Sequence, residues 1–153
     1  MYSELTGLEL KPSTALPHRR PDRSYVPELV GSASAGGLGH LQKLMDTLGK
    51  EKMQVLLKIS HQSQTAFHAA CRKNHVAVME FIYSNFGFDV ESRCGRSLHT
   101  PLFEAVSGDA KEAVKWLMEH GASKDTPSKY GNTPYSLAEE HNLTEILSIL
   151  NIY

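Results

Sequence analysis

Residues 99–106 of this chain have the sequence HTPLFEAV, and two other segments repeat their pattern. Residues 64–71 are QTAFHAAC and residues 132–139 are NTPYSLAE, so a threonine holds the second place and an alanine the seventh place in all three. The threonines are 35 and then 33 residues apart. A unit that recurs at a period of about 20–50 residues is typical of repeat proteins, in which stacked copies share one core.

The residue types in this pattern predict the start of a helix. A threonine before a helix accepts a hydrogen bond from a backbone amide two or three residues further on. Pro101 and Pro134 follow their threonines directly, and proline suits the first helical position because its missing N–H removes no helical bond there. A small residue such as Ala70 or Ala105 lets the helix pack closely on its neighbour.

Apolar residues at the helical spacing i, i+3, i+4, i+7 follow these segments and also precede the first one. The sets are Leu38, Leu41, Met45 and Leu48; Val78, Met79 and Ile82; Ala110, Ala113, Val114 and Leu117; and Leu143, Ile146, Leu147 and Leu150. No strong alternating pattern predicts a strand. We therefore expect an all-α fold of helices joined by short turns.

The three segments resemble the ankyrin-repeat family, whose unit of about 33 residues carries the signature T-P-L-H-x-A. Residues 87–91 (GFDVE) and 121–125 (GASKD) are similar to the family's G-A-D-V-N turn, and Asn74-His75 is similar to its G-H pair between the two helices. The resemblance implies an ankyrin-repeat solenoid of helix-turn-helix units with β-turn fingers. About three repeats are the minimum for a stable stack.

The same resemblance divides the chain. Repeats are expected at about 61–95, 96–128 and 129–153, after a degenerate capping repeat at about 33–60 in which Lys50 to Ile59 form an extra short helix. Residues 1–32 hold four of the seven prolines and no apolar stripe, so we expect an extended Pro-rich arm there.

The first interval between repeats is two residues longer than the second. The alignment places one extra residue near Asn85-Phe86 and one between Arg93 and Leu98, so the finger between these two repeats is expected to be longer than usual. In the place of His68, the second repeat has Phe103 and the third has Ser136. These departures do not change the expected fold, and they identify no particular partner.

Composition excludes several classes of protein. The 153 residues carry 16 Lys+Arg and 17 Asp+Glu, which is no signature of nucleic-acid binding. Two cysteines are too few for a disulfide-stapled secreted scaffold, and no apolar run approaches the ~18 residues that span a bilayer. We expect an intracellular protein in the cytoplasm or nucleus, and a complex in an organelle matrix stays open.

Some residues have the spacing of a metal site or the chemistry of a nucleophile. His68, Cys71 and His75 match metal ligands on a helix, with His61 as a candidate fourth ligand. The family pattern explains the first three as a structural histidine, a small core position and a loop histidine. We favour that explanation and predict no metal, cofactor or catalytic residue. Cys94 is expected on a finger turn as an ordinary exposed thiol, with a reactive thiol as the alternative.

Ankyrin proteins bind partners through their finger tips and the inner faces of the first helices, and the resemblance carries this over to thirteen positions. They are Gln62, Gln64, Arg72 and Lys73 in the first repeat; Arg96, Ser97, His99, Glu104 and Ser107 in the second; and Lys129, Tyr130, Asn132 and His141 in the third. Tyr130 and Arg96 are the strongest candidates, because aromatic and arginine side chains dominate interface energetics. The alternative for any one position is a solvated surface residue.

The arm carries a basic cluster of Arg19, Arg20 and Arg23, followed by Tyr25. We predict that these four residues contact a partner, and a solvated linker is the alternative. The favoured function is a non-enzymatic protein-binding adaptor or accessory subunit of a multi-subunit complex, held by the concave face and tethered by the arm. The alternatives are a small ankyrin-type inhibitor of an enzyme such as a kinase, and a zinc- or thiol-dependent enzyme.

Overall fold

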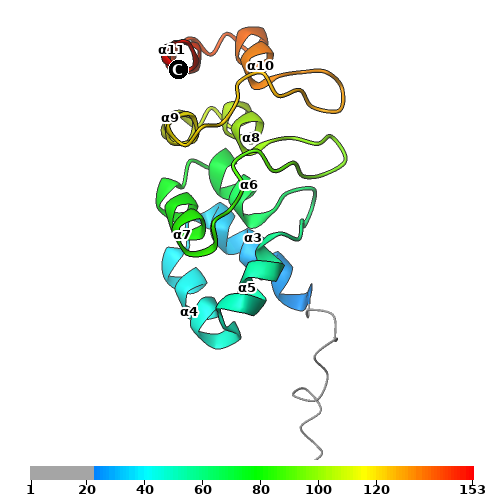
Figure 1. The fold of residues 1–153 in the computed structure, drawn as a ribbon, viewed down its shortest axis with the longest axis vertical. Helices are drawn as coiled ribbons and strands as arrows, with labels where there is room; N and C mark the ends of the chain where they lie inside the picture. Colours follow the sequence, from blue (N-terminus) through cyan, green and yellow to red (C-terminus); the bar gives the residue numbers. More distant parts are fainter. Residues whose placement is uncertain (1–22) are drawn as a thin grey trace, which may run out of the picture.

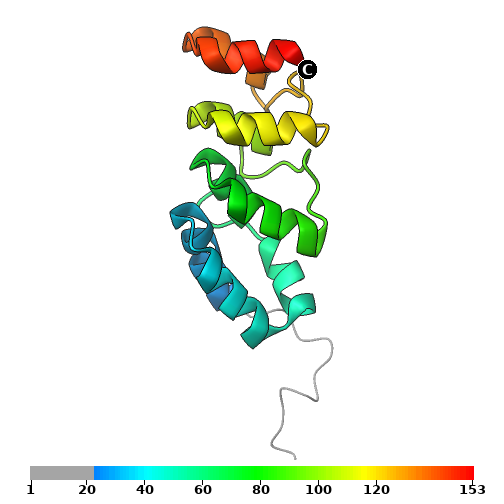
Figure 2. The same ribbon diagram turned by 90° about the vertical axis from the view of Figure 1, so that its left-hand side faces the viewer.

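The computed structural model describes residues 23–153, which form a stack of four helix pairs (Figures 1 and 2). The first helices of the pairs are α3 (Val26–Ala35), α6 (Ala66–Arg72), α8 (Pro101–Ser107) and α10 (Pro134–Glu140). The second helices are α4 (Leu38–Leu48), α7 (Val76–Phe86), α9 (Lys111–Glu119) and α11 (Thr144–Ile152). A short 3₁₀ helix, η1 (Arg23–Tyr25), precedes α3, and α5 (Lys50–Leu57) follows α4. The all-α ankyrin-type solenoid is confirmed.

Each clear repeat begins as its sequence predicts. The backbone amide three residues further on donates to the threonine side chain, at 3.3 Å for Thr65, 3.2 Å for Thr100 and 3.0 Å for Thr133. Pro101 and Pro134 occupy the first helical positions. The caps satisfy amides that a helix start leaves without a partner, so they define where each first helix begins.

The core runs the length of the stack. Consecutive first helices pack on one another, α3 on α6, α6 on α8 and α8 on α10, and the second helices α7, α9 and α11 do the same. Small buried residues, Ala70, Ala105 and Ala138, lie on the first helices. Trp116 on α9 is also buried. Within residues 23–153, no helix combines the length and the apolar character needed to cross a membrane.

The expected extended arm is wrong for residues 26–32, which belong to helix α3. Val26, Leu29, Val30 and Ala33 have the helical spacing i, i+3, i+4, i+7 and are buried in the core. The proline that argued against a helix, Pro27, stands in the first turn of α3, where its missing N–H removes no helical bond. Because α3 packs on α6, it is the first helix of the capping repeat, which therefore begins before residue 33.

The longer finger is confirmed. In the finger after α7, an antiparallel bridge joins Cys94 to His99, with four residues between them. In the finger after α9, the amide of Ser128 donates to the carbonyl of Asn132 at 2.7 Å, with three residues between them. The extra helix is confirmed as well, since α5 follows the capping pair and precedes the finger before α6. We call the fingers that precede α6, α8 and α10 the first, second and third fingers.

Candidate functional site

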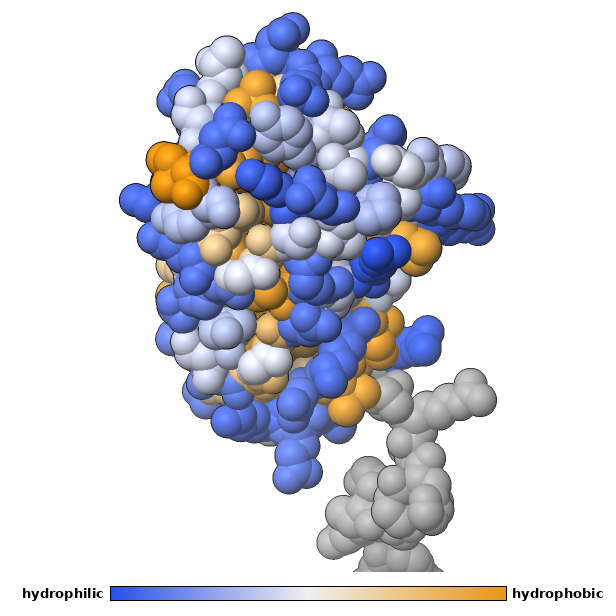
Figure 3. Space-filling view, turned by 45° about the horizontal axis from the view of Figure 1, so that its top comes forward, coloured by the Kyte–Doolittle hydropathy of each residue, from blue (hydrophilic) through white to orange (hydrophobic). Residues whose placement is uncertain are grey.

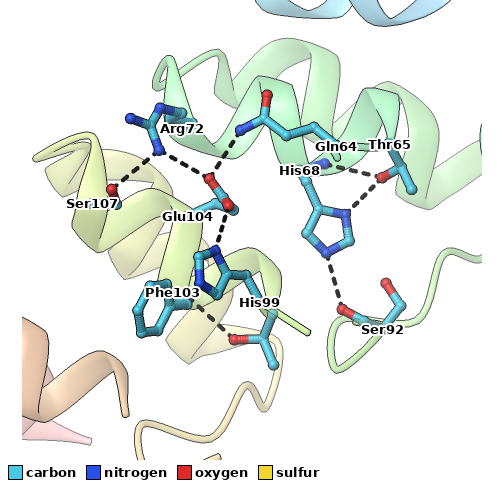
Figure 4. Close-up of polar contacts among 10 residues, drawn as sticks. Gln64, Thr65, His68, Arg72, Ser92, His99, Phe103, Glu104 and Ser107 are labelled. Carbon is cyan, nitrogen blue, oxygen red and sulfur yellow. Dashed lines mark hydrogen bonds and ion pairs between the residues drawn. The ribbon is translucent and has the colours of Figure 1, made fainter. Parts of the chain in front are cut away.

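A buried carboxylate lies at the centre of a polar cluster between the first and second repeats (Figure 4). Glu104 on α8 is 4% exposed. Gln64 Nε2 donates to its Oε2 at 2.9 Å, the Arg72 guanidinium to the same oxygen at 3.1 Å, and His99 Nδ1 lies 3.0 Å from Oε1. A buried charge is tolerated when it is paired and hydrogen-bonded, and these three donors meet that requirement.

The cluster extends along the inner side of the first helices. The Arg72 guanidinium also donates to Ser107 Oγ at 3.1 Å, which joins the ends of α6 and α8. The structure therefore brings five of the thirteen predicted binding residues into one network. We call this network the Glu104 cluster, and it consists of Gln64, Arg72, His99, Glu104 and Ser107.

A small pocket opens beside this cluster at the base of the fingers. It has a volume of about 180 Å³ and is lined by Gln62, Ser63, Gln64, Cys94, Gly95, Ser97, His99 and Glu104. Two more predicted residues, Gln62 and Ser97, thus join the same site. The first two fingers touch here, since a Cβ on Gly95 would lie 2.8 Å from the carbonyl oxygen of Ser63.

The third finger is attached to the second. The amide of Lys129 donates to the carbonyl of Ser97 at 2.8 Å, so the two tips lie side by side. Tyr130 beside it is 70% exposed. Arg96 and Asn132 are also exposed on these two fingers. The fingers thus present a tyrosine and an arginine next to the pocket.

The other predicted contacts lie apart from the cluster. Lys73 and His141 are exposed residues that end α6 and α10. Arg23 is exposed in η1, whereas Tyr25 is half-buried and packs against the core. The predictions for Arg19 and Arg20, and for an extended arm over residues 1–22, fall outside the described residues.

The histidine of the first repeat has a structural role. His68 Nε2 lies 3.0 Å from the carbonyl oxygen of Ser92, which only accepts, so Nε2 carries the proton. Nδ1 is then an acceptor for the Thr65 hydroxyl at 2.6 Å. Burial lowers the pKa of His68 to about 4, which keeps the ring neutral. Both ring nitrogens therefore make hydrogen bonds that hold the fold together.

The other candidate metal ligands have explanations of their own. His75 Nε2 lies 3.0 Å from the carbonyl oxygen of Ser34 and ties α7 to α3. Cys71 is fully buried, and burial raises the pKa of its thiol well above the ordinary value. In the part of the chain that the structure describes, no three His, Cys, Asp or Glu residues are grouped so as to hold a metal ion.

The expected exposure of Cys94 is wrong. Cys94 is 6% exposed, because it begins the closed tip of the second finger and lies where that finger touches the first finger. Burial raises the pKa of the Cys94 thiol to about 12. The group is therefore a protonated thiol at neutral pH.

The burial of Glu104 was also missed, since the family resemblance places it on the partner-binding surface. The equivalent places in the other repeats are Ala69 and Leu137, 35 residues before and 33 after. A carboxylate in a place that neighbouring repeats give to an apolar residue is the signal that identifies it. Ser92 was missed because it is a single serine within a finger, without any pattern.

Comparison with known proteins agrees with this geometry. Residues 67–118 match a family model described as ankyrin repeats in many copies. This chain contains ankyrin repeats. Its repeats indicate a protein–protein interaction module, and the family is generally non-enzymatic.

Three relatives match parts of this chain. The chain is 35% identical over 86 residues to the ankyrin repeat protein YahD of Escherichia coli (strain K12), and this match covers 53% of the chain and 42% of YahD. It is 38% identical over 85 residues to ankyrin repeat and SOCS box protein 11 of Danio rerio, covering 54% and 27%. It is 25% identical over 162 residues to tyrosine-protein kinase HTK16 of Hydra vulgaris, covering 95% and 21%. The chain spans less than half the length of each of these relatives.

Proposed function

We propose that this chain is a non-enzymatic adaptor or accessory subunit that binds a protein partner through the Glu104 cluster and the second and third fingers. The observation that carries the proposal is the pocket of about 180 Å³ beside the buried Glu104 carboxylate, which the first two fingers form together. The proposal includes an intracellular site of action, since Cys71 and Cys94 are both unpaired thiols.

The cluster suits recognition because its polar groups are held in place before a partner arrives. Three donors fix the Glu104 carboxylate, and the Lys129–Ser97 backbone bond fixes the two finger tips. Groups that are already ordered lose little conformational entropy on binding. The exposed ring of Tyr130 beside them supplies the apolar area that anchors interfaces.

The surface chemistry fits a partner that is bound by mixed polar and apolar contacts. Figure 3 shows a mostly hydrophilic face on which apolar residues form separate patches. The large apolar residues that are exposed in the described part of the chain are Val55, Leu98, Tyr130, Ile152 and Tyr153. Leu98 and Tyr130 are the two that lie on fingers, so the apolar contribution at the proposed site comes from these finger tips.

Quantitative affinity capture tests the proposal. The full chain is used as bait in a lysate of the source organism, and each captured protein is measured by mass spectrometry. The bait variant combines Arg96→Ala, Ser97→Ala and Tyr130→Ala, which should lower capture of the partner at least about tenfold, because interface anchors contribute about 2 kcal/mol or more each.

A matched control combines Lys115→Ala, Glu119→Ala and Ser148→Ala, three exposed changes on the second helices α9 and α11. This control should retain the partner. Equal loss with both variants, or no protein captured at stoichiometric yield by the unaltered chain, contradicts the proposal.

Deletion of residues 1–22 separates a tethered subunit from a compact inhibitor. Deletion of residues 1–32 would not do so, because it removes Val26, Leu29 and Val30 from the core. Loss of partner affinity in the 1–22 deletion supports a tethered subunit. Unchanged affinity favours the inhibitor, in which the repeats alone hold the partner.

A further inference from the structure

A second pocket lies between α5 and the second finger, away from the Glu104 cluster. It has a volume of about 250 Å³ and is lined by Lys58, Thr65, Phe88, Asp89, Ser92 and Arg93. It shares no residue with the pocket beside Glu104 or with the thirteen predicted binding positions. The proposed function therefore leaves this pocket without a role.

The pocket results from the two places where this chain departs from a regular repeat. Lys58 ends the extra helix α5, and Arg93 lies at the start of the finger segment that holds an extra residue. The floor is regular core: the Phe88 ring stacks on Phe67, with ring centroids 4.6 Å apart.

One polar group at this pocket lacks a partner. The Ser92 carbonyl accepts from His68 and the Ser92 amide donates to the carbonyl of Asp89 at 3.1 Å. The Ser92 Oγ is buried, and it is the one buried side-chain nitrogen or oxygen in the described residues with no hydrogen bond. A buried hydroxyl without a partner destabilises a protein, and a guest that bonds to it removes that penalty.

The charges at the pocket select the kind of guest. Lys58 and Arg93 are both exposed, and Asp89 is the one carboxylate among the lining residues. The Asp89 side chain already accepts from the amide of Glu91 at 2.9 Å. The rim is therefore net positive by one charge and attracts an acidic segment.

We propose that this pocket binds the phenol side chain of a tyrosine in an acidic segment of a partner protein. A volume of about 250 Å³ lies below the ~300–1,000 Å³ of sites for drug-sized molecules and fits one aromatic side chain. The phenol ring packs on Phe88, and its hydroxyl pairs with Ser92 Oγ as donor or acceptor after a change of the Ser92 rotamer turns that buried oxygen toward the pocket. The flanking carboxylates pair with Lys58 and Arg93.

The probe is the peptide acetyl-Glu-Asp-Tyr-Asp-Glu-amide, titrated into the ¹⁵N-labelled full chain and followed by NMR. The amides of Phe88, Ser92 and Arg93 should shift. Peptides with Phe in place of Tyr, or Lys in place of each acid, should bind at least about fivefold more weakly, because each loses one hydrogen bond or the charge attraction.

Ser92→Ala is the matching change in the protein. It should weaken binding of the tyrosine peptide about fivefold and leave binding of the phenylalanine peptide unchanged. The loss from the protein substitution and the loss from the peptide substitution therefore do not add. The thermal midpoint of Ser92→Ala should not fall, because Ser92 Oγ makes no hydrogen bond in the described residues. Ser97→Ala, in the other pocket, should leave the peptide affinity unchanged.

Three results overturn the proposal. One is the absence of shifts at Phe88 and Ser92 with peptide at millimolar concentration. Another is equal binding of the tyrosine and phenylalanine peptides. The third is a shift of Ser92 on deletion of residues 1–22 without any peptide, which would assign the pocket to the chain's own N-terminal segment. Because the residues differ, failure here leaves the test of the Glu104 cluster unaffected.

Discussion

The guanidinium of Arg72 lies 3.1 Å from the carboxylate of Glu104, and the two side chains differ in exposure, at 42% for Arg72 and 5% for Glu104. The pair joins the first repeat to the second. Because Arg72 reaches water, the loss of Glu104 leaves it solvated, whereas Glu104 depends on its protein partners. The carboxylate is thus the member of the pair that needs its partner.

This asymmetry predicts unequal effects of two alanine substitutions. Arg72→Ala should lower the free energy of unfolding by about 1–3 kcal/mol, because it leaves the buried Glu104 carboxylate with only Gln64 and His99 as partners. Glu104→Ala should lower it by less, because it removes a buried charge and leaves the Arg72 guanidinium in water. Urea unfolding measures both values. Equal losses, or a larger loss for Glu104→Ala, would contradict the assignment.

Gly108 is expected to be the least replaceable glycine in the stack. A Cβ at this position would lie 2.1 Å from the carbonyl oxygen of Arg72, where α8 ends beside α6. The obstructing atom is backbone, so Gly108→Ala must separate the two repeats and should cost more than about 2 kcal/mol. Thermal or urea unfolding checks this value.

The control for Gly108 is Gly31 in helix α3, where a Cβ would meet no atom within 4 Å. Gly31→Ala should raise the free energy of unfolding by about 0.5–1 kcal/mol, because alanine has the higher helix propensity. A higher free energy of unfolding for Gly31→Ala, together with a lower one for Gly108→Ala, would distinguish steric contact between repeats from helix propensity. A neutral Gly108→Ala would show that the repeats can move apart freely.

The repeats could be predicted because each of their rules is local. A threonine cap, a proline after it and an apolar stripe all lie within about ten residues, so sequence alone placed α6, α8 and α10. Helix α3 obeys the same stripe rule, but Pro27 concealed it. Proline breaks a helix interior and suits a first turn, and only the position of the helix start distinguishes the two.

The site could be predicted in part, for a different reason. The positions that face inward follow from the repeat register, which is why Gln64, Arg72 and Ser107 lie in one network. The burial of Glu104 and of Cys94 depends on how one finger rests on the next. Contacts between repeats involve residues about 30 to 40 apart, and no local pattern encodes them.

His68 predicts a pH dependence of stability. Its pKa is about 4 in the folded chain and 6.5, the ordinary value for histidine, in the unfolded chain. Between these pH values the unfolded chain binds a proton that the folded chain does not, so stability falls as the pH is lowered. The loss is roughly 1.4 kcal/mol for each pH unit and about 3 kcal/mol over the whole window.

The measurement compares urea unfolding of the unaltered chain and of His68→Gln at several pH values between 4 and 7. His68→Gln should be less stable at pH 7, because it disturbs the bonds to Thr65 and Ser92, and should lose less stability as the pH falls. His141→Gln is the control, since His141 is exposed at the end of α10. Parallel pH profiles for His68→Gln and the unaltered chain would disprove the role of burial.

The two thiols should resist modification until the stack opens. Cys71 is fully buried and Cys94 is 6% exposed, with a pKa of about 12. At pH 8 the thiolate fraction of Cys94 is then on the order of 10⁻⁴, so attack on a disulfide reagent is slow. Absorbance after addition of such a reagent should show little labelling of the native chain and rapid release of two equivalents in denaturant. Cys94→Ala should leave the native trace nearly unchanged, and fast native labelling that this substitution abolishes would show that the second finger leaves its thiol accessible.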